Sequence, residues 1–120
     1  MRYEIFIPRW APPSLNRCRG RHWSAEHRLK KEAAAFVGTY ALANRVPDAA
    51  GRRRVAVVVT LPPGAPARDL DNLDKILLDA LVRARLLLDD GARGLDGRLG
   101  VEFRRGEEES TTLILEDVPS

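Results

Sequence analysis

Residues 2–7 alternate between polar and apolar, so that Tyr3, Ile5 and Ile7 would share one side of an extended chain. This period of two is typical of a strand with one buried face. Prolines follow at positions 8, 12 and 13, and proline has no N–H to donate to a sheet ladder. The pattern predicts a first strand over residues 2–7 and then a loop over residues 9–23.

The pattern changes to helical spacing from about residue 25 to about residue 44, a segment rich in Ala, Leu, Glu and Lys. Ser24 is a suitable N-cap for this helix. A second helical pattern runs from residue 69 or 70 to about residue 85. The expected buried stripes are Leu29, Ala33, Phe36, Val37, Tyr40 and Ala41 in the first helix, and Leu70, Leu73, Leu77, Ala80, Leu81 and Ala84 in the second.

Three further segments have the character of strands. Residues 55–61 form a nearly continuous run of β-branched apolar residues, which predicts a central strand covered on both faces. Residues 98–104 and 111–116 alternate and lie close in sequence, which predicts an antiparallel hairpin. The expected fold is α+β, with the element order β-α-β-α-β-β: a small mixed sheet of about four strands with two helices packed on it.

The chain has 120 residues, which favours a single domain over residues 1–120. No apolar run reaches the length of a membrane span, and the first residues lack the apolar core of a signal peptide. Cys18 is the only cysteine, so an internal disulfide is excluded. These features favour a cytoplasmic protein that does not enter a membrane.

The net charge of +3 hides two unlike halves. Residues 1–54 hold 12 Lys and Arg against 4 Asp and Glu, a net +8, whereas residues 55–120 hold 8 against 13, a net −5. A basic half is typical of proteins that bind a phosphate backbone. It is equally consistent with a solvated, arginine-rich surface.

Acidic residues gather at the expected start of the second helix, at Asp69, Asp71 and Asp74, and again past its end at Asp89 and Asp90. Crowded carboxylates repel one another unless a cation lies between them. Hard cations such as Mg²⁺ prefer carboxylate oxygens and support phosphodiester hydrolysis. Asp69 and Asp71 can face one ligand from the first helical turn, and Asp90 joins them only if the chain folds back after the helix.

The same residues also have a structural interpretation. Asp69 suits a helix N-cap, worth about 1 kcal/mol, and Asp71 and Asp74 suit the positive end of the helix dipole. Lys75 could form an ordinary i,i+4 ion pair with Asp71, or could stabilise charge on phosphorus in an active site. Three aspartates within six residues exceed what capping requires, which favours the metal site, with Asp74 as its dispensable member.

Several short motifs follow one another along residues 2–105: Pro12-Pro13-Ser14-Leu15-Asn16, Arg21-His22-Trp23, Lys30-Lys31, Asp69-Leu70-Asp71-Asn72-Leu73 with Lys75, Asp79-Ala80-Leu81, and Leu88-Asp89-Asp90. In this combination the chain resembles the RusA-type Holliday junction resolvases. The resemblance implies a homodimeric endonuclease that binds four-way DNA junctions. With Mg²⁺ or Mn²⁺ it would make paired symmetric nicks in DNA recombination and repair, leaving 5′-phosphate products.

The resemblance also implies roles for individual residues. Asp69, Asp71 and Asp90 match the catalytic, metal-binding aspartates, and Lys75 matches the catalytic lysine. Asn72 and Asp89 are candidates for supporting these ligands. The expected DNA-binding residues are Arg17, Arg19, Arg21, Lys30, Lys31 and Arg68, although any one of them could be a solvated surface residue.

Two other functions remain open from the sequence. A non-catalytic nucleic-acid-binding module would use the carboxylates only as helix caps and would bind DNA without Mg²⁺. A phosphohydrolase of small nucleotides would need a closed pocket with a wall that recognises the base, and no segment of the sequence indicates one.

Overall fold

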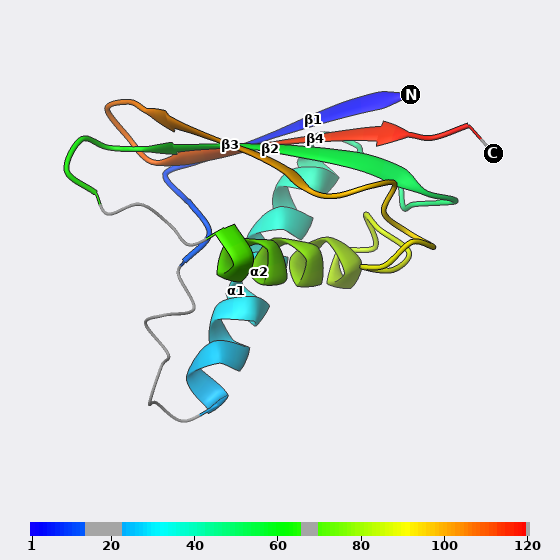
Figure 1. Ribbon diagram of the computed structural model, residues 1–120, viewed down its shortest axis with the longest axis horizontal. Coiled ribbons are helices and arrows are strands. Elements are labelled where there is room, and N and C mark those ends of the chain that lie inside the picture. The colour runs from blue at the N-terminus through cyan, green and yellow to red at the C-terminus, as the bar shows by residue number, and fades with distance from the viewer. Residues whose placement is uncertain (14–22, 66–69, 120) are drawn as a thin grey trace.

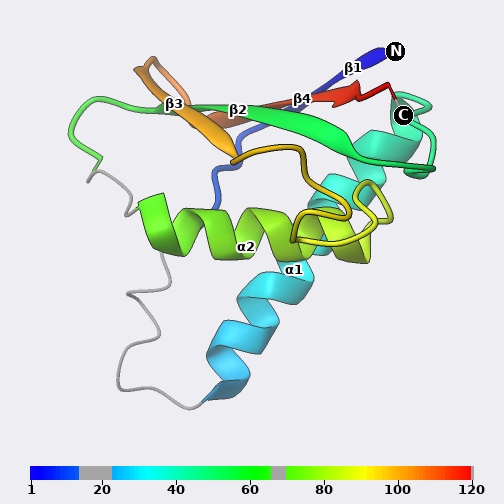
Figure 2. The same ribbon diagram turned by 45° about the vertical axis from the view of Figure 1, so that its right-hand side comes forward.

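The chain forms one four-stranded mixed sheet with both helices on the same side of it (Figures 1 and 2). The computed structural model describes residues 1–13, 23–65 and 70–119, without the side chains of residues 23, 24 and 70–72. The elements follow the order β1 (Arg2–Pro8), α1 (Trp23–Ala43), β2 (Arg53–Leu61), α2 (Leu70–Arg83), β3 (Gly100–Arg105) and β4 (Ser110–Asp117). The predicted α+β fold and element order are confirmed.

The strands lie in the order β1-β4-β2-β3, so the predicted hairpin between the last two strands is wrong. β2 lies between β3 and β4 and pairs parallel with β3 but antiparallel with β4. Helix α2 carries the chain back to the starting end of the sheet, and such a crossover makes the strands it joins parallel. β3 therefore becomes an edge strand, and its exposed Glu102, Arg104 and Arg105 are typical of a protected edge.

The prediction that other parts of the protein cover both faces of β2 is also wrong. Val55, Val57 and Val59 are buried toward the helices, while Ala56 is exposed and Val58 is only half-buried. Because both helices lie on one side, the alternate residues of β2 face away from them (Figure 2). The residues that face away from the helices are also small or β-branched. The sequence of β2 therefore does not show the alternation of buried and exposed positions that the structure has.

The core lies between the sheet and the helices. In α1 the buried residues are Ala33, Val37 and Ala41, at helical spacing as predicted. Phe36 departs from the prediction, since 42% of its surface is exposed and its ring stacks on Trp10 with centroids 5.7 Å apart. Trp10 is thus a packing residue in this structure.

The buried face of α2 is wider than the predicted stripe. Its members are Leu73, Ile76, Leu77, Ala80 and Leu81. Ile76 was not expected there, and Leu87, just past the helix, is buried as well. Ile76 and Leu87 therefore belong to a core face that is broader than the predicted stripe.

Arg53 at the start of β2 is a charged residue in the core, with only 1% of its surface exposed. Its Nε donates to Asp117 Oδ1 (2.8 Å), and its terminal nitrogens donate to the carbonyls of Leu86 (3.1 Å) and Pro47 (3.0 Å). The guanidinium also lies 5.2 Å from the centre of the Tyr3 ring. Arg53 therefore fastens β2 to β4 and to the two loops that flank it.

The neighbours of Arg53 also have partners on the protein. Arg52 and Arg54 both pair with Asp96, at 3.4 and 3.0 Å. These contacts make the three consecutive arginines a structural cluster more than an open basic patch. Across the described segments, no helix combines the length and apolar character needed to cross a membrane.

Candidate functional site

The chain after α2 folds back, and Asp90 returns to the side of that helix. It lines a pocket of about 360 Å³, here called the acidic pocket, together with residues of both helices. The pocket residues are Lys30 from α1, Asp74, Lys75, Leu78, Asp79 and Val82 from α2, and Asp90. Two predicted catalytic residues, Lys75 and Asp90, thus meet at one pocket.

A tight reversal at the end of α2 starts the return. Arg85 has a positive φ of 63°, the left-handed conformation that commonly ends helices. The amides of Leu86 and Leu87 then both donate to the carbonyl of Leu81, at 2.8 and 3.2 Å. The burial of both leucines holds the reversed chain against the core, so the direction in which Asp90 is presented is set by packing.

A second anchor holds the far side of the loop. The N–H of Arg53 donates to the carbonyl of Gly94 (2.9 Å), and the N–H of Asp96 donates to the carbonyl of Arg53 (3.0 Å). Gly94 is buried against the backbone of Asp89, where a Cβ would clash with the Asp89 amide and carbonyl. The predicted supporting residue Asp89 is half-buried in this contact and is not among the residues that line the pocket.

Helical spacing explains which residues of α2 face the pocket. Asp74, Leu78 and Val82 are four residues apart, and Lys75 and Asp79 form a second such row beside them. Position 71 lies four residues before Lys75, so its backbone continues this face by one turn. The side chains of Asp71 and Asn72, and the whole of Asp69, lie outside the described residues.

Two members of the pocket were missed or demoted at the sequence level. Asp74, predicted to be dispensable for the metal site, lines the pocket with its Oδ1 atom buried, and its dispensability stays a prediction. Asp79 received no role, although it stands four residues after Lys75 and has a buried Oδ2 atom. The signal that identifies both is their spacing of three and four residues from other members of this face.

The pocket is lined by three carboxylates and two ammonium groups. Asp79 Oδ2 lies 2.9 Å from Nε of Arg83, and Lys30 Nζ lies 3.3 Å from Oε1 of Glu26. Both ion pairs are partly exposed, so each contributes little to stability. The excess of carboxylate over ammonium favours a positively charged ligand in this pocket.

The predicted divalent cation can be tested against these donors. Among the side chains that the structure describes, no three from His, Cys, Asp or Glu lie close enough together to hold a metal ion. The carboxylate of Asp90 is nevertheless the oxygen donor that Mg²⁺ prefers, and it shares a pocket with two further carboxylates. Of the three predicted ligands, Asp90 is the one whose side chain is described, and those of Asp69 and Asp71 lie outside the described residues.

The predicted DNA-binding residues fall into two groups. Arg17, Arg19, Arg21 and Arg68 lie outside the described residues. Lys31 is exposed on α1, and Lys30 is half-buried at the acidic pocket. Lys30 is therefore the one of these residues that the described part of the chain brings next to Asp90.

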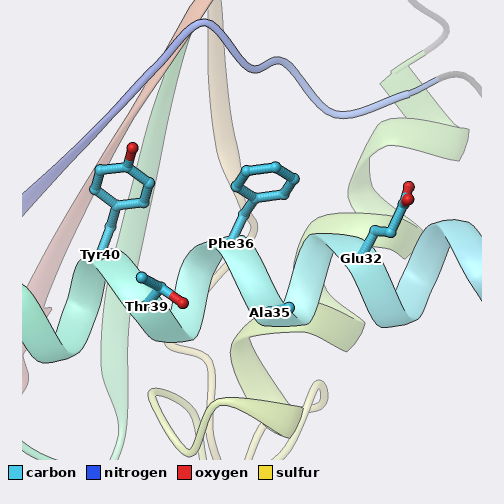
Figure 3. Close-up of a pocket in the computed structure, with 5 residues that line it drawn as sticks. All are labelled: Glu32, Ala35, Phe36, Thr39 and Tyr40. Atoms are coloured by element: carbon cyan, nitrogen blue, oxygen red, sulfur yellow. The ribbon is translucent and has the colours of Figure 1, made fainter.

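Another pocket, of about 320 Å³, lies along α1 on the side that faces the chain after β1 (Figure 3). Its lining residues are Glu32, Ala35, Phe36, Thr39 and Tyr40, and the rings of Phe36 and Tyr40 project side by side from the helix (Figure 3). Glu32 is the one acidic or basic residue among them. This pocket therefore has fewer charged side chains than the acidic pocket.

Comparison with known proteins adds no assignment: no family model matches the chain, and no curated protein gives a significant match.

Proposed function

We propose that this protein is a Mg²⁺-dependent, structure-selective endonuclease that resolves four-way DNA junctions, with its active site at the acidic pocket. The proposal includes a homodimer, because two copies related by a two-fold axis would present two sites to opposed strands of a two-fold substrate. A role in DNA recombination and repair follows from that substrate.

The observation that carries the proposal is the return of Asp90 to the side of α2 that holds Lys75. A site made of all three aspartates can form only if Asp90 returns to α2. Asp90 comes 19 residues after Asp71, so the sequence alone allows it to lie on any part of the surface. An Asp90 on an unrelated surface would have removed the three-carboxylate site. The helical face that continues from Lys75 back to position 71 gives further support.

In the proposed site, Asp69, Asp71 and Asp90 would hold the divalent cation. When bound, that cation makes water more acidic and offsets negative charge on the phosphate. The ammonium group of Lys75, on the same pocket wall, stabilises the additional charge that develops on the phosphoryl oxygens. Asp74 and Asp79 keep the pocket negative, so that an anionic substrate binds well only together with a cation.

The test is the cleavage of synthetic four-way junctions by the native protein and by Asp71→Asn, Asp90→Asn and Asp48→Asn variants, with and without Mg²⁺. Asp48 is exposed in the loop before β2, so its variant makes the same change of charge away from the pocket. We expect the first two variants to bind junctions but to cut them at least about 100-fold more slowly, and Asp48→Asn to match the native protein.

Undiminished cleavage by Asp90→Asn would refute the site. Junction binding by the native protein without any Mg²⁺-dependent cleavage would instead support a non-catalytic binding module. Preferential hydrolysis of mononucleotides would point to a small-molecule phosphohydrolase.

A further inference from the structure

A second pocket adjoins the acidic pocket where α1 and α2 pack together. It has a volume of about 220 Å³ and is lined by Glu26, His27 and Lys30 of α1 and by Arg83 of α2. We call it the basic pocket, because three of its four residues carry basic nitrogens. Lys30 lines both pockets, and the pair of Asp79 with Arg83 joins one to the other.

We infer that the basic pocket is a second phosphate subsite, which binds a phosphate of the nucleic-acid backbone near the one at Asp90. This inference deepens the proposed function and rests on it for the identity of the polymer. The subsite itself is defined by Lys30 and Arg83, neither of which is needed as a metal ligand.

Both cations retain hydrogen-bonding capacity for a ligand. In the described part of the chain the ion pair of Arg83 with Asp79 runs through Nε, and a guanidinium has further N–H donors on its two terminal nitrogens. Glu26 is the ion-pair partner of Lys30 within the described residues, and an ammonium group has three N–H donors. A guanidinium binds phosphate through two parallel hydrogen bonds, so the open edge of Arg83 suits a phosphate group.

The existing ion pairs do not prevent this use. The side chains of Arg83 and Asp79 are 39% and 29% exposed, and those of Lys30 and Glu26 are 27% and 43% exposed. Ion pairs this exposed are weak, and phosphate can replace or share the carboxylate at little loss. The pairs also hold Lys30 and Arg83 in the pocket before the ligand arrives, which lowers the entropy lost on binding.

The arrangement of the two pockets indicates the class of substrate. The acidic pocket attracts a cation and, with it, one phosphate, whereas the basic pocket offers the N–H donors of Lys30 and Arg83 to a phosphate directly. A molecule with a single phosphate can occupy one of the pockets at a time. A polynucleotide has successive phosphates on one chain and can occupy both, so the pair of pockets favours a polymer over a nucleoside monophosphate.

The experiment measures binding of a fluorescently labelled four-way junction in Ca²⁺, as a function of salt, for four proteins: native, Arg83→Gln, Arg83→Lys and Arg45→Gln. Arg45 is exposed just past the opposite end of α1 and serves as the matched loss of one positive charge. We expect Arg83→Gln to bind roughly fivefold more weakly and to lower the slope of log K against log salt by about one. Arg83→Lys should keep most of the slope, and Arg45→Gln should match the native protein.

Cleavage kinetics in Mg²⁺ provide a readout that loss of folding would not imitate. A phosphate subsite away from the scissile bond predicts that Arg83→Gln raises KM about fivefold while kcat changes less than about twofold. Equal binding slopes for Arg83→Gln and Arg45→Gln would overturn the subsite even if the protein cuts junctions. A lowered slope without any cleavage by the native protein would uphold the subsite and refute the nuclease.

Discussion

Replacing Arg53 with methionine tests whether a buried charge anchors this fold. Methionine keeps most of the side-chain length but removes the donors to Asp117, Leu86 and Pro47. The carbonyl of Leu86 lies in the core and loses a charged donor, which costs about 1–3 kcal/mol. The carbonyl of Pro47 is near solvent and can bind water instead.

The ion pair adds a smaller amount, because the side chain of Asp117 is 40% exposed and water can solvate it once Arg53 is gone. Such a pair is worth up to about 1 kcal/mol. The sum is about 1–4 kcal/mol, with a central value of about 2.5 kcal/mol, to be compared with a total stability of about 6–18 kcal/mol for 120 residues. For a domain of this size the loss corresponds to a melting temperature about 10 °C lower.

Urea and thermal unfolding followed by circular dichroism would measure this difference. The matched control is Arg54→Met, one residue along the same strand. Its side chain is 59% exposed and pairs with Asp96 and Glu116 at the surface, so the expected loss is less than about 1 kcal/mol. If the two variants lost the same stability to within about 0.5 kcal/mol, the burial of Arg53 would not have the energetic role assigned to it.

Two further predictions concern pH and the loop that carries Asp90. The hydrogen bond from Arg53, together with its charge, holds the pKa of Asp117 below its ordinary value of 3.8, so this carboxylate stabilises the fold fully above that value and progressively less as the pH falls through the lowered pKa. Unfolding free energies measured from pH 6 down to pH 2 should therefore fall more steeply for the native protein than for Asp117→Asn, and parallel curves would contradict the assignment. Gly94→Ala places a methyl group against the backbone of Asp89 and should lower stability by at least about 2 kcal/mol in urea titrations, together with slower junction cleavage. Gly51→Ala is its control, since a Cβ there meets nothing within 4 Å, and a Gly94→Ala variant as stable as this control would show that the loop is not closely packed.

The local pattern of apolar residues is sufficient to predict the helices and strands, but not the order in which the strands pair in the sheet. The alternation of Tyr3, Ile5 and Ile7 and the spacing of Ala33, Val37 and Ala41 predicted β1 and α1 correctly, because each element buries one face. Partner choice among strands is a long-range property, and nothing in residues 98–116 records that β2 lies between the last two strands.

Tertiary contacts also decided the residues that the sequence misjudged. Phe36 has the right spacing for the core but lies at the rim, where Trp10 provides its partner. Arg53 sits in a run of three arginines that suggests a surface patch, yet it is buried because Asp117 and two carbonyls converge on it. Its neighbours Val55 and Val57 gave a partial signal, since the same alternation places residue 53 on the inner face.

The position of Asp90 depends on the loop after α2 and not on the strand order. Helix α2 already returns the chain to the end of the sheet where β3 must start, so the parallel pairing of β2 and β3 does not require the loop to pass along the helix. The reversal at Arg85, closed by the amides of Leu86 and Leu87, is what brings Asp90 back to the side of α2. The loop is then fixed at both sides, by the burial of Leu86 and Leu87 and by the bridge between Arg53 and Leu95. A carboxylate on a segment anchored in this way loses little entropy when it binds a ligand, which is the property that a metal-holding residue needs.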